Sequence, residues 1–114
     1  MDIYHIWCDL QPGQDDLEFV RATRAYLDHL QARGALHGYR ITRRKLGLAP
    51  ADLGEFHMML EFTDLAQLDD AFGRAAARRD PVEALHRAVN QRVQGARFAL
   101  YRDFPDPGRD AQGA

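Results

Sequence analysis

The order in which short alternating segments and longer amphipathic segments follow one another constrains the fold of this chain most strongly. Four segments alternate apolar and polar residues, as half-buried β-strands do: residues 3–10, 38–46, 55–62 and 96–103. Three others space their apolar residues three or four apart, as helices do: residues 16–33, 65–75 and 82–93. The predicted order is therefore a strand, a helix, two strands, two helices and a last strand.

Helix-capping residues support these boundaries. Asp15, with Glu18 three residues later, is a capping box in front of the first helix. Asp80 followed by Pro81 is an N-cap with proline at the first helical position, which opens the third helix. Gly95 is expected to end that helix, because glycine tolerates the left-handed conformation that terminates many helices.

This order of elements predicts a ferredoxin-like α+β fold, with a four-stranded antiparallel sheet and helices on one face only. The right-handed crossover rule places the first strand between the third and the fourth. The second strand carries many charges and is expected at an edge of the sheet. Residues 1–104 are expected to form one domain, and residues 105–114, rich in proline and glycine, a flexible C-terminal tail.

Composition excludes several classes of function. With 114 residues and a net charge of -2, the chain lacks the basic excess that binding to nucleic-acid phosphates requires. Its single cysteine, Cys8, forms no internal disulfide and is expected to be a small buried hydrophobe. No stretch approaches the ~20 apolar residues of a membrane span, and no signal peptide is recognised. These features predict a cytoplasmic protein with neither nucleic acid nor membrane as a partner.

The alternation also assigns side chains to the two faces of the sheet. The row expected to face the helices is Tyr4, Ile6, Cys8, Leu10, Tyr39, Ile41, Phe56, Met58, Leu60, Phe62, Phe98 and Leu100. The row expected on the open face is His5, Trp7, Asp9, Arg40, Thr42, Arg44, His57, Met59, Glu61, Ala99, Tyr101 and Asp103. An open face that mixes aromatic and sulfur-bearing side chains with histidines marks an interface. A homodimer closed over this face is the prediction.

The histidines of the open face are the candidate catalytic groups. His57 is assigned as a general base, with His5 and Tyr101 orienting the substrate or donating a proton. The alternative is that all three are hydrogen-bonded interface residues. A metal-dependent protein that uses His5, His57 and Glu61 is a further alternative. His86, on the third predicted helix, is interpreted as a core or boundary histidine rather than as a haem ligand.

Four further residues are candidate ligand contacts. Arg44, in the basic run 43–45, is suited to hold an anionic group, although a solubilising edge strand also explains that run. Trp7 stacks on a flat ligand or packs against the partner chain. Met59 and Glu61 complete the set, since both share the open face with Trp7.

The segments 3–10, 42–48, 54–57 and 98–105 resemble those of a small family of uncharacterised bacterial proteins, over residues 1 to about 107. More broadly, the layout resembles the dimeric α/β-barrel superfamily. Its members include cofactor-independent monooxygenases of the antibiotic-biosynthesis type, muconolactone isomerases, stress-responsive barrel proteins and haem-degrading enzymes. The resemblance implies two ferredoxin-like sheets that face each other in a homodimer and enclose cavities.

The function expected from these observations is binding of, or action on, a small organic molecule by a homodimer. The pocket is expected between sheet and helices or between the two sheets. Cofactor-independent oxygenation or isomerisation are the candidate reactions, with no cofactor required. A non-catalytic binding or structural dimer module is the competing hypothesis.

Overall fold

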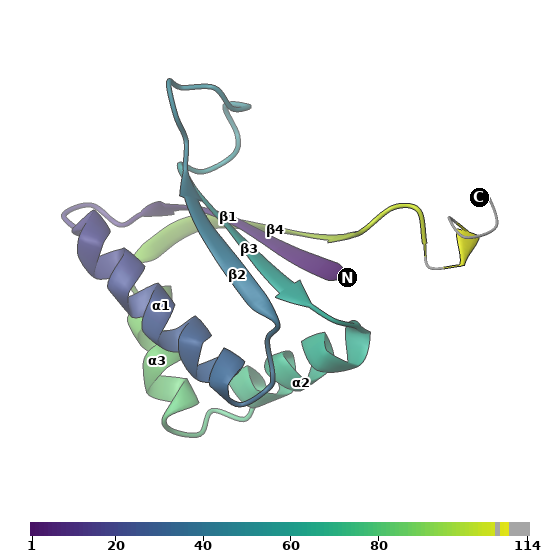
Figure 1. Cartoon of the computed structure of the whole chain (residues 1–114). Helices are drawn as coiled ribbons and strands as arrows, with labels where there is room; N and C mark the ends of the chain where they lie inside the picture. Colours follow the sequence, from purple (N-terminus) through teal and green to yellow (C-terminus); the bar gives the residue numbers. More distant parts are fainter. Residues whose placement is uncertain (107, 110–114) are drawn as a thin grey trace.

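Four strands and three helices form two layers in the computed structural model, which describes residues 1–106, 108 and 109 (Figure 1). The elements are β1 (Asp2–Leu10), α1 (Asp16–Ala32), β2 (Gly38–Arg43), β3 (Phe56–Phe62), α2 (Leu65–Ala76), α3 (Val82–Asn90) and β4 (Val93–Arg102). All strand pairs are antiparallel in the order β2-β3-β1-β4, and the helices cover one face of the sheet (Figure 1). The predicted α+β, ferredoxin-like fold and its strand order are confirmed.

Two expectations concern parts of the chain outside this core. Of the predicted tail at 105–114, residues 107 and 110–114 lie outside the described part of the chain. Within the part that is described, no helix is long and apolar enough to cross a bilayer.

The strand β3 shows the two-sided character of the sheet most clearly. Buried and half-buried residues alternate along it, and its buried row is Phe56, Met58, Leu60 and Phe62. That row meets the apolar stripe of α1, where the ring of Phe19 lies 5.0 Å from that of Phe56. Burying each such side chain stabilises the fold by roughly 2 kcal/mol. The predicted assignment of β3 side chains to the helix side is confirmed.

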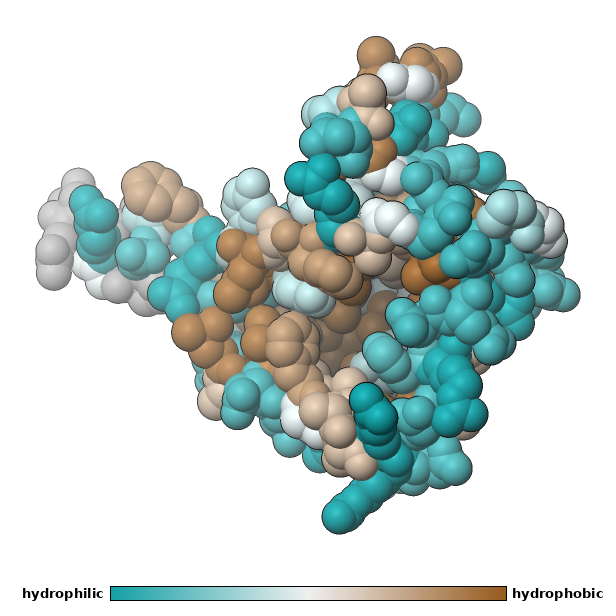
Figure 2. Space-filling model, turned by 180° about the vertical axis from the view of Figure 1, so that it is seen from behind, coloured by the Kyte–Doolittle hydropathy of each residue, from teal (hydrophilic) through white to brown (hydrophobic). Residues whose placement is uncertain are grey.

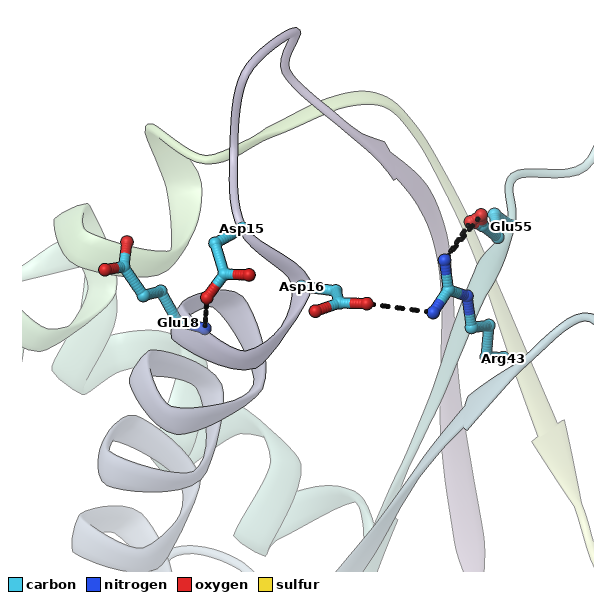
Figure 3. A network of polar contacts seen from close by, with 5 residues as sticks. All are labelled: Asp15, Asp16, Glu18, Arg43 and Glu55. Carbon is cyan, nitrogen blue, oxygen red and sulfur yellow. Dashed lines mark hydrogen bonds and ion pairs between the residues drawn. The ribbon is translucent and has the colours of Figure 1, made fainter.

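Arg43 fixes the first turn of α1 against the β2–β3 edge. Its guanidinium donates to Asp16 at 3.0 Å and to Glu55 at 3.2 Å (Figure 3). In the same turn, the Asp15 carboxylate accepts a hydrogen bond from the backbone N–H of Glu18 at 3.2 Å, so the predicted N-cap is confirmed (Figure 3). The first member of the basic run is thus engaged within the fold.

Two predicted boundaries are wrong for conformational reasons. The strand β2 ends at Arg43 rather than at residue 46, because Leu46 and Gly47 adopt φ of 56° and 67° and turn the chain. The helix α3 ends at Asn90, and β4 begins at Val93. Gly95, expected to stop the helix, instead lies within β4 with φ of 63°.

The position of Gly95 coincides with a shift in strand register. On β1, Trp7 pairs with Arg97 and Asp9 with Gln94, so β4 carries one extra residue between the two pairs. A left-handed glycine at such a site is typical of a β-bulge. In the sequence, a single glycine between a helical segment and a strand looks the same whether it ends the helix or forms a bulge in the strand. The prediction that Gly95 ends the helix was wrong for this reason.

The strand β4 is an edge strand, and its helix-side row is incompletely covered. Phe98 and Leu100 face the helix side as predicted, with the Phe98 ring stacked 5.8 Å from that of Tyr4. Nevertheless they are 59% and 51% exposed, because the helices lie mainly over the other strands. An apolar opening therefore remains beside β4.

Candidate functional site

Four predicted site residues lie together on the open face. His5 Nδ1 lies 2.9 Å from His57 Nε2, within hydrogen-bonding distance across β1 and β3. The His57 ring stacks on Trp7 with centroids 4.6 Å apart and planes 11° from parallel. Tyr101 meets His5 edge-on at 4.9 Å. The strand register thus brings histidines and aromatic rings into one cluster, as predicted.

The environment of the cluster favours neutral imidazoles. Burial lowers the pKa of His5, and burial together with the nearby charge of His5 lowers the pKa of His57. Two hydrogen-bonded imidazoles share one proton between the facing nitrogens, so one donates and the other accepts. Such a pair can take up a proton, or it can hold two strands together at an interface.

Of the remaining predicted site residues on β3, Met59 lies beside this pair and Glu61 lies further along the strand. Met59 pairs with His5 across β1 and β3, whereas Glu61 pairs with Ile3 and with Gly38. Glu61 follows His57 by four residues along an extended strand, which separates them by about 13 Å.

A metal site at His5, His57 and Glu61 is the alternative that the sequence left open. Among the residues that the structure describes, no group of three or more histidine, cysteine and acidic side chains is placed to hold a metal ion. Within one chain, His5, His57 and Glu61 are therefore not grouped as a three-ligand site among the described residues.

Arg44 belongs to the loop that follows β2. Its backbone N–H donates to the Glu55 carbonyl at 2.7 Å, and its guanidinium donates to the Leu53 carbonyl at 2.7 Å. The side chain is therefore used to close the base of its own loop.

A cavity lies on the other side of the sheet, between the sheet and the helices α1 and α3. It has a volume of about 150 Å³. Its lining is Ile6, Cys8, Thr23, Tyr26, Leu27, Met58, Leu60, His86, Val89, Asn90, Val93, Ala96 and Phe98. Short side chains from three elements, Cys8, Thr23 and Ala96, leave this space open. The cavity is predominantly apolar, as ligand sites for organic molecules are.

The cavity opens into a wider hollow of about 710 Å³ beside β4. Six residues line both spaces: Ile6, Tyr26, Leu60, His86, Asn90 and Phe98. Figure 2 shows this hollow as a brown, apolar depression with polar residues around it. Phe72 and Phe98, 45% and 59% exposed, lie at its rim. A molecule of ordinary metabolite size fits such a hollow.

Three polar side chains, Tyr26, His86 and Asn90, line both the cavity and the hollow. The rings of Tyr26 and His86 meet edge-on, with centroids 5.5 Å apart, where α1 packs on α3. Asn90 lies one helical turn after His86 and lines the same space. Burial raises the pKa of the Tyr26 hydroxyl, so the hydroxyl stays protonated at neutral pH and can donate a hydrogen bond to a ligand.

Cys8 also lines the cavity, but its thiol is unreactive. It is fully buried, and burial together with the charge of Asp9 raises the pKa of its thiol to about 11. A protonated thiol is a poor nucleophile. The prediction of a small buried hydrophobe at Cys8 is confirmed.

Reasoning from the sequence missed the polar part of this cavity. The sequence predicts a core or boundary histidine at His86 and gives Tyr26 no role beyond its place in the predicted helix 16–33. One signal was available in the sequence: Tyr26 and His86 each lie beside apolar residues on a helix that must pack on the same sheet. That signal becomes specific only once α1 and α3 are known to be neighbours.

Solved structures share this architecture. A dimeric ferredoxin-like protein of unknown function from Jannaschia is 18% identical, with a TM-score of 0.61 over 90% of this chain and 100% of that chain. A dabb family protein with a ferredoxin-like fold from Mesorhizobium loti is 16% identical, with a TM-score of 0.61 over 90% and 96%. SnoaB, a cofactor-independent oxygenase from Streptomyces nogalater, is 12% identical, with a TM-score of 0.66 over 95% and 97%.

These identities are low, so the likeness establishes the fold alone. No curated protein matches the chain. A family of unknown function, DUF6614, matches it over residues 1–114. The chain therefore belongs to the family of unknown function DUF6614, and its fold is that of the ferredoxin-like, dimeric α/β-barrel proteins.

Proposed function

We propose that this protein is a cytoplasmic homodimer that binds a small, largely apolar organic molecule between its sheet and its helices. The observation that carries the proposal is the apolar cavity of about 150 Å³ that opens into a hollow of about 710 Å³. Apolar walls with a few convergent polar groups are what small-molecule sites generally present. Tyr26, His86 and Asn90 are those groups here.

We further propose that the bound molecule is turned over without a cofactor, by oxygenation or isomerisation. The similarity in fold to SnoaB, a cofactor-independent oxygenase, supports this class of reaction. An imidazole can accept a proton from the substrate, and a protonated tyrosine can stabilise the charge that results. His86 and Tyr26 are the candidates for these roles, since their rings meet edge-on and both line the cavity and the hollow. Binding without turnover would instead favour a non-catalytic module.

The homodimer closes over the open face of the sheet. Trp7, Met59 and Tyr101 share this face, and burying their apolar surface against a second subunit is energetically favourable. The Jannaschia protein of similar fold is dimeric, which supports the same arrangement here.

A second candidate site is the histidine pair on the open face. The 2.9 Å separation of His5 Nδ1 and His57 Nε2 favours it, since a hydrogen-bonded imidazole pair is a competent proton acceptor. In this alternative His57 is the base, His5 and Tyr101 orient the substrate, and Arg44 binds an anionic group. Trp7, Met59 and Glu61 would then contact a ligand between the two sheets.

A variant that narrows the hollow beside β4 distinguishes the helix-side site from the site at the histidine pair. Ala75, half-buried on α2, lines the hollow, and Ala75→Trp places a large side chain in it. The apolar fluorescent probe anilinonaphthalene sulfonate is titrated into wild type and variant, with circular dichroism as the control for folding. Ala75→Trp is expected to weaken probe binding at least tenfold. Ala25→Trp, on the exposed side of α1, is the matched control and should bind like wild type. Equal binding by Ala75→Trp would refute the helix-side site.

A further inference from the structure

The loop between β2 and β3 projects from one end of the sheet and carries an apolar tip. Residues 45–51, hereafter the arm, have the sequence Lys-Leu-Gly-Leu-Ala-Pro-Ala. Leu46 and Leu48 are 84% and 79% exposed, more than any leucine in the helices. In Figure 1 the arm stands away from the sheet on the side opposite the helices. The arm therefore lies on the same side of the sheet as the open face.

The base of the arm is fixed to the sheet. Asp52 accepts from the Arg97 guanidinium at 2.8 Å, and Arg97 lies on the open face of β4, opposite Trp7. Gly54 lies directly on the backbone of Cys8, so that a side chain there would overlap β1. These contacts hold the arm in one direction, which is what a preorganised binding element requires.

The turn at the tip is strained in a way that keeps Leu46 exposed. The N–H of Leu48 donates to the carbonyl of Lys45 at 3.0 Å, and both central residues, Leu46 and Gly47, have positive φ. Turns of this type favour asparagine or glycine at both central positions, and a leucine there is uncommon. A leucine at a strained, exposed position is accounted for if its side chain is buried in a complex.

A stable dimer of this chain needs more contact area than the open face alone offers, which favours a contribution from the arm. Four strands about 4.8 Å apart and about seven residues long cover roughly 450 Å² in projection. A stable interface buries about 800 Å² on each partner. Side-chain relief raises the accessible area of the face, but a projecting arm at its end supplies the remaining contact. A copy seated on the face would meet the arm because the Arg97–Asp52 pair places its base at the margin of that face.

We infer that the arm clasps the second subunit, with Leu46 and Leu48 packed against it. This inference rests on the proposed homodimer and assigns to residues 45–51 a role that the sheet face alone does not fulfil. The contact is reciprocal, because a twofold dimer uses the same surface of both chains.

Sedimentation equilibrium over a dilution series of the full chain tests this inference. The double variant Leu46→Ser/Leu48→Ser is expected to raise the dimer Kd by about tenfold or more, since it removes apolar surface from the interface. Leu17→Ser, at a 56% exposed leucine on the outer side of α1, is the matched control and should leave Kd unchanged. Asp52→Asn, which removes the charge that anchors the arm, should raise Kd by a smaller factor.

The possible outcomes distinguish the role of the arm from the existence of the homodimer. A wild-type dimer whose Kd is unchanged by the double variant overturns the role of the arm and leaves the homodimer standing. Ala99→Glu places a charge on the open face of the edge strand β4, where residue 99 pairs with His5 of β1. A dimer that survives Ala99→Glu with unchanged Kd removes the face-to-face arrangement, and the arm with it. A wild-type monomer at micromolar concentration contradicts both.

Discussion

Replacing Gly54 by alanine is expected to destabilise the protein far more than its position in a loop suggests. A Cβ at residue 54 would lie 2.4 Å from the carbonyl carbon of Cys8, 2.5 Å from its oxygen and 2.7 Å from its nitrogen. Ordinary contacts to a Cβ begin near 3.4 Å, so the loop and β1 must separate by about 1 Å. The obstacle is backbone rather than a rotatable side chain, and it cannot move aside locally.

The expected cost follows from that overlap. Overpacking costs about 1–3 kcal/mol in ordinary cores, and an overlap with backbone belongs at the upper end of that range. A loss of about 3 kcal/mol is a large share of the 5–15 kcal/mol that stabilises a typical domain. It should lower Tm by roughly 10 °C or more.

Urea unfolding followed by far-ultraviolet circular dichroism measures this free energy directly. Gly73→Ala, in the middle of α2 with nothing within 4 Å of the added Cβ, is the matched control. It should stabilise the protein by about 0.5–1 kcal/mol, because alanine has the higher helix propensity. The two substitutions therefore shift stability in opposite directions. If Gly54→Ala unfolds within 0.5 kcal/mol of wild type, the packing of this loop on β1 is not as described.

Two further results are expected. His5 and His57 have pKa values below the usual 6.5 in the folded chain, so the unfolded chain takes up protons first as the pH falls. The stability that the neutral histidine pair contributes is therefore complete above pH 6.5 and lost below it. Urea unfolding between pH 5 and pH 8 should show this loss in wild type and in the exposed-site control His37→Asn, and the same loss in His57→Gln would refute the assignment. The Cys8 thiol, fully buried and with a pKa of about 11, should react with iodoacetamide at pH 7 only after denaturation, and rapid labelling of the native protein would show that the cavity wall is open at β1.

The parts of the fold that could be predicted are those where one physical signal dominates. Along β3 the alternation from Phe56 to Phe62 has one interpretation, because only one face of that strand can be buried. Capping at Asp15 was equally clear. At Gly95 two structures share one signal, and the choice between a helix stop and a bulge depends on the pairing of β4 with β1.

Part of the candidate site could likewise be predicted from the sequence and part could not. Grouping His5, His57, Trp7 and Tyr101 needed only strand order and alternation, and the structure brings them together. The cavity could not be predicted, since it is the space left between elements rather than a pattern within one. Its polar groups come from helices whose relative placement is fixed by tertiary packing, so His86 looked like an ordinary boundary residue.

Native mass spectrometry of the purified protein tests the central claim most directly, because it reports subunit number and bound molecules together. We predict a dimer that carries a small organic molecule, which is lost or strongly reduced in Ala75→Trp and retained in Ala25→Trp. A dimer whose bound molecule is unaffected by Ala75→Trp would place the site elsewhere, and a monomer with no bound molecule would contradict the account.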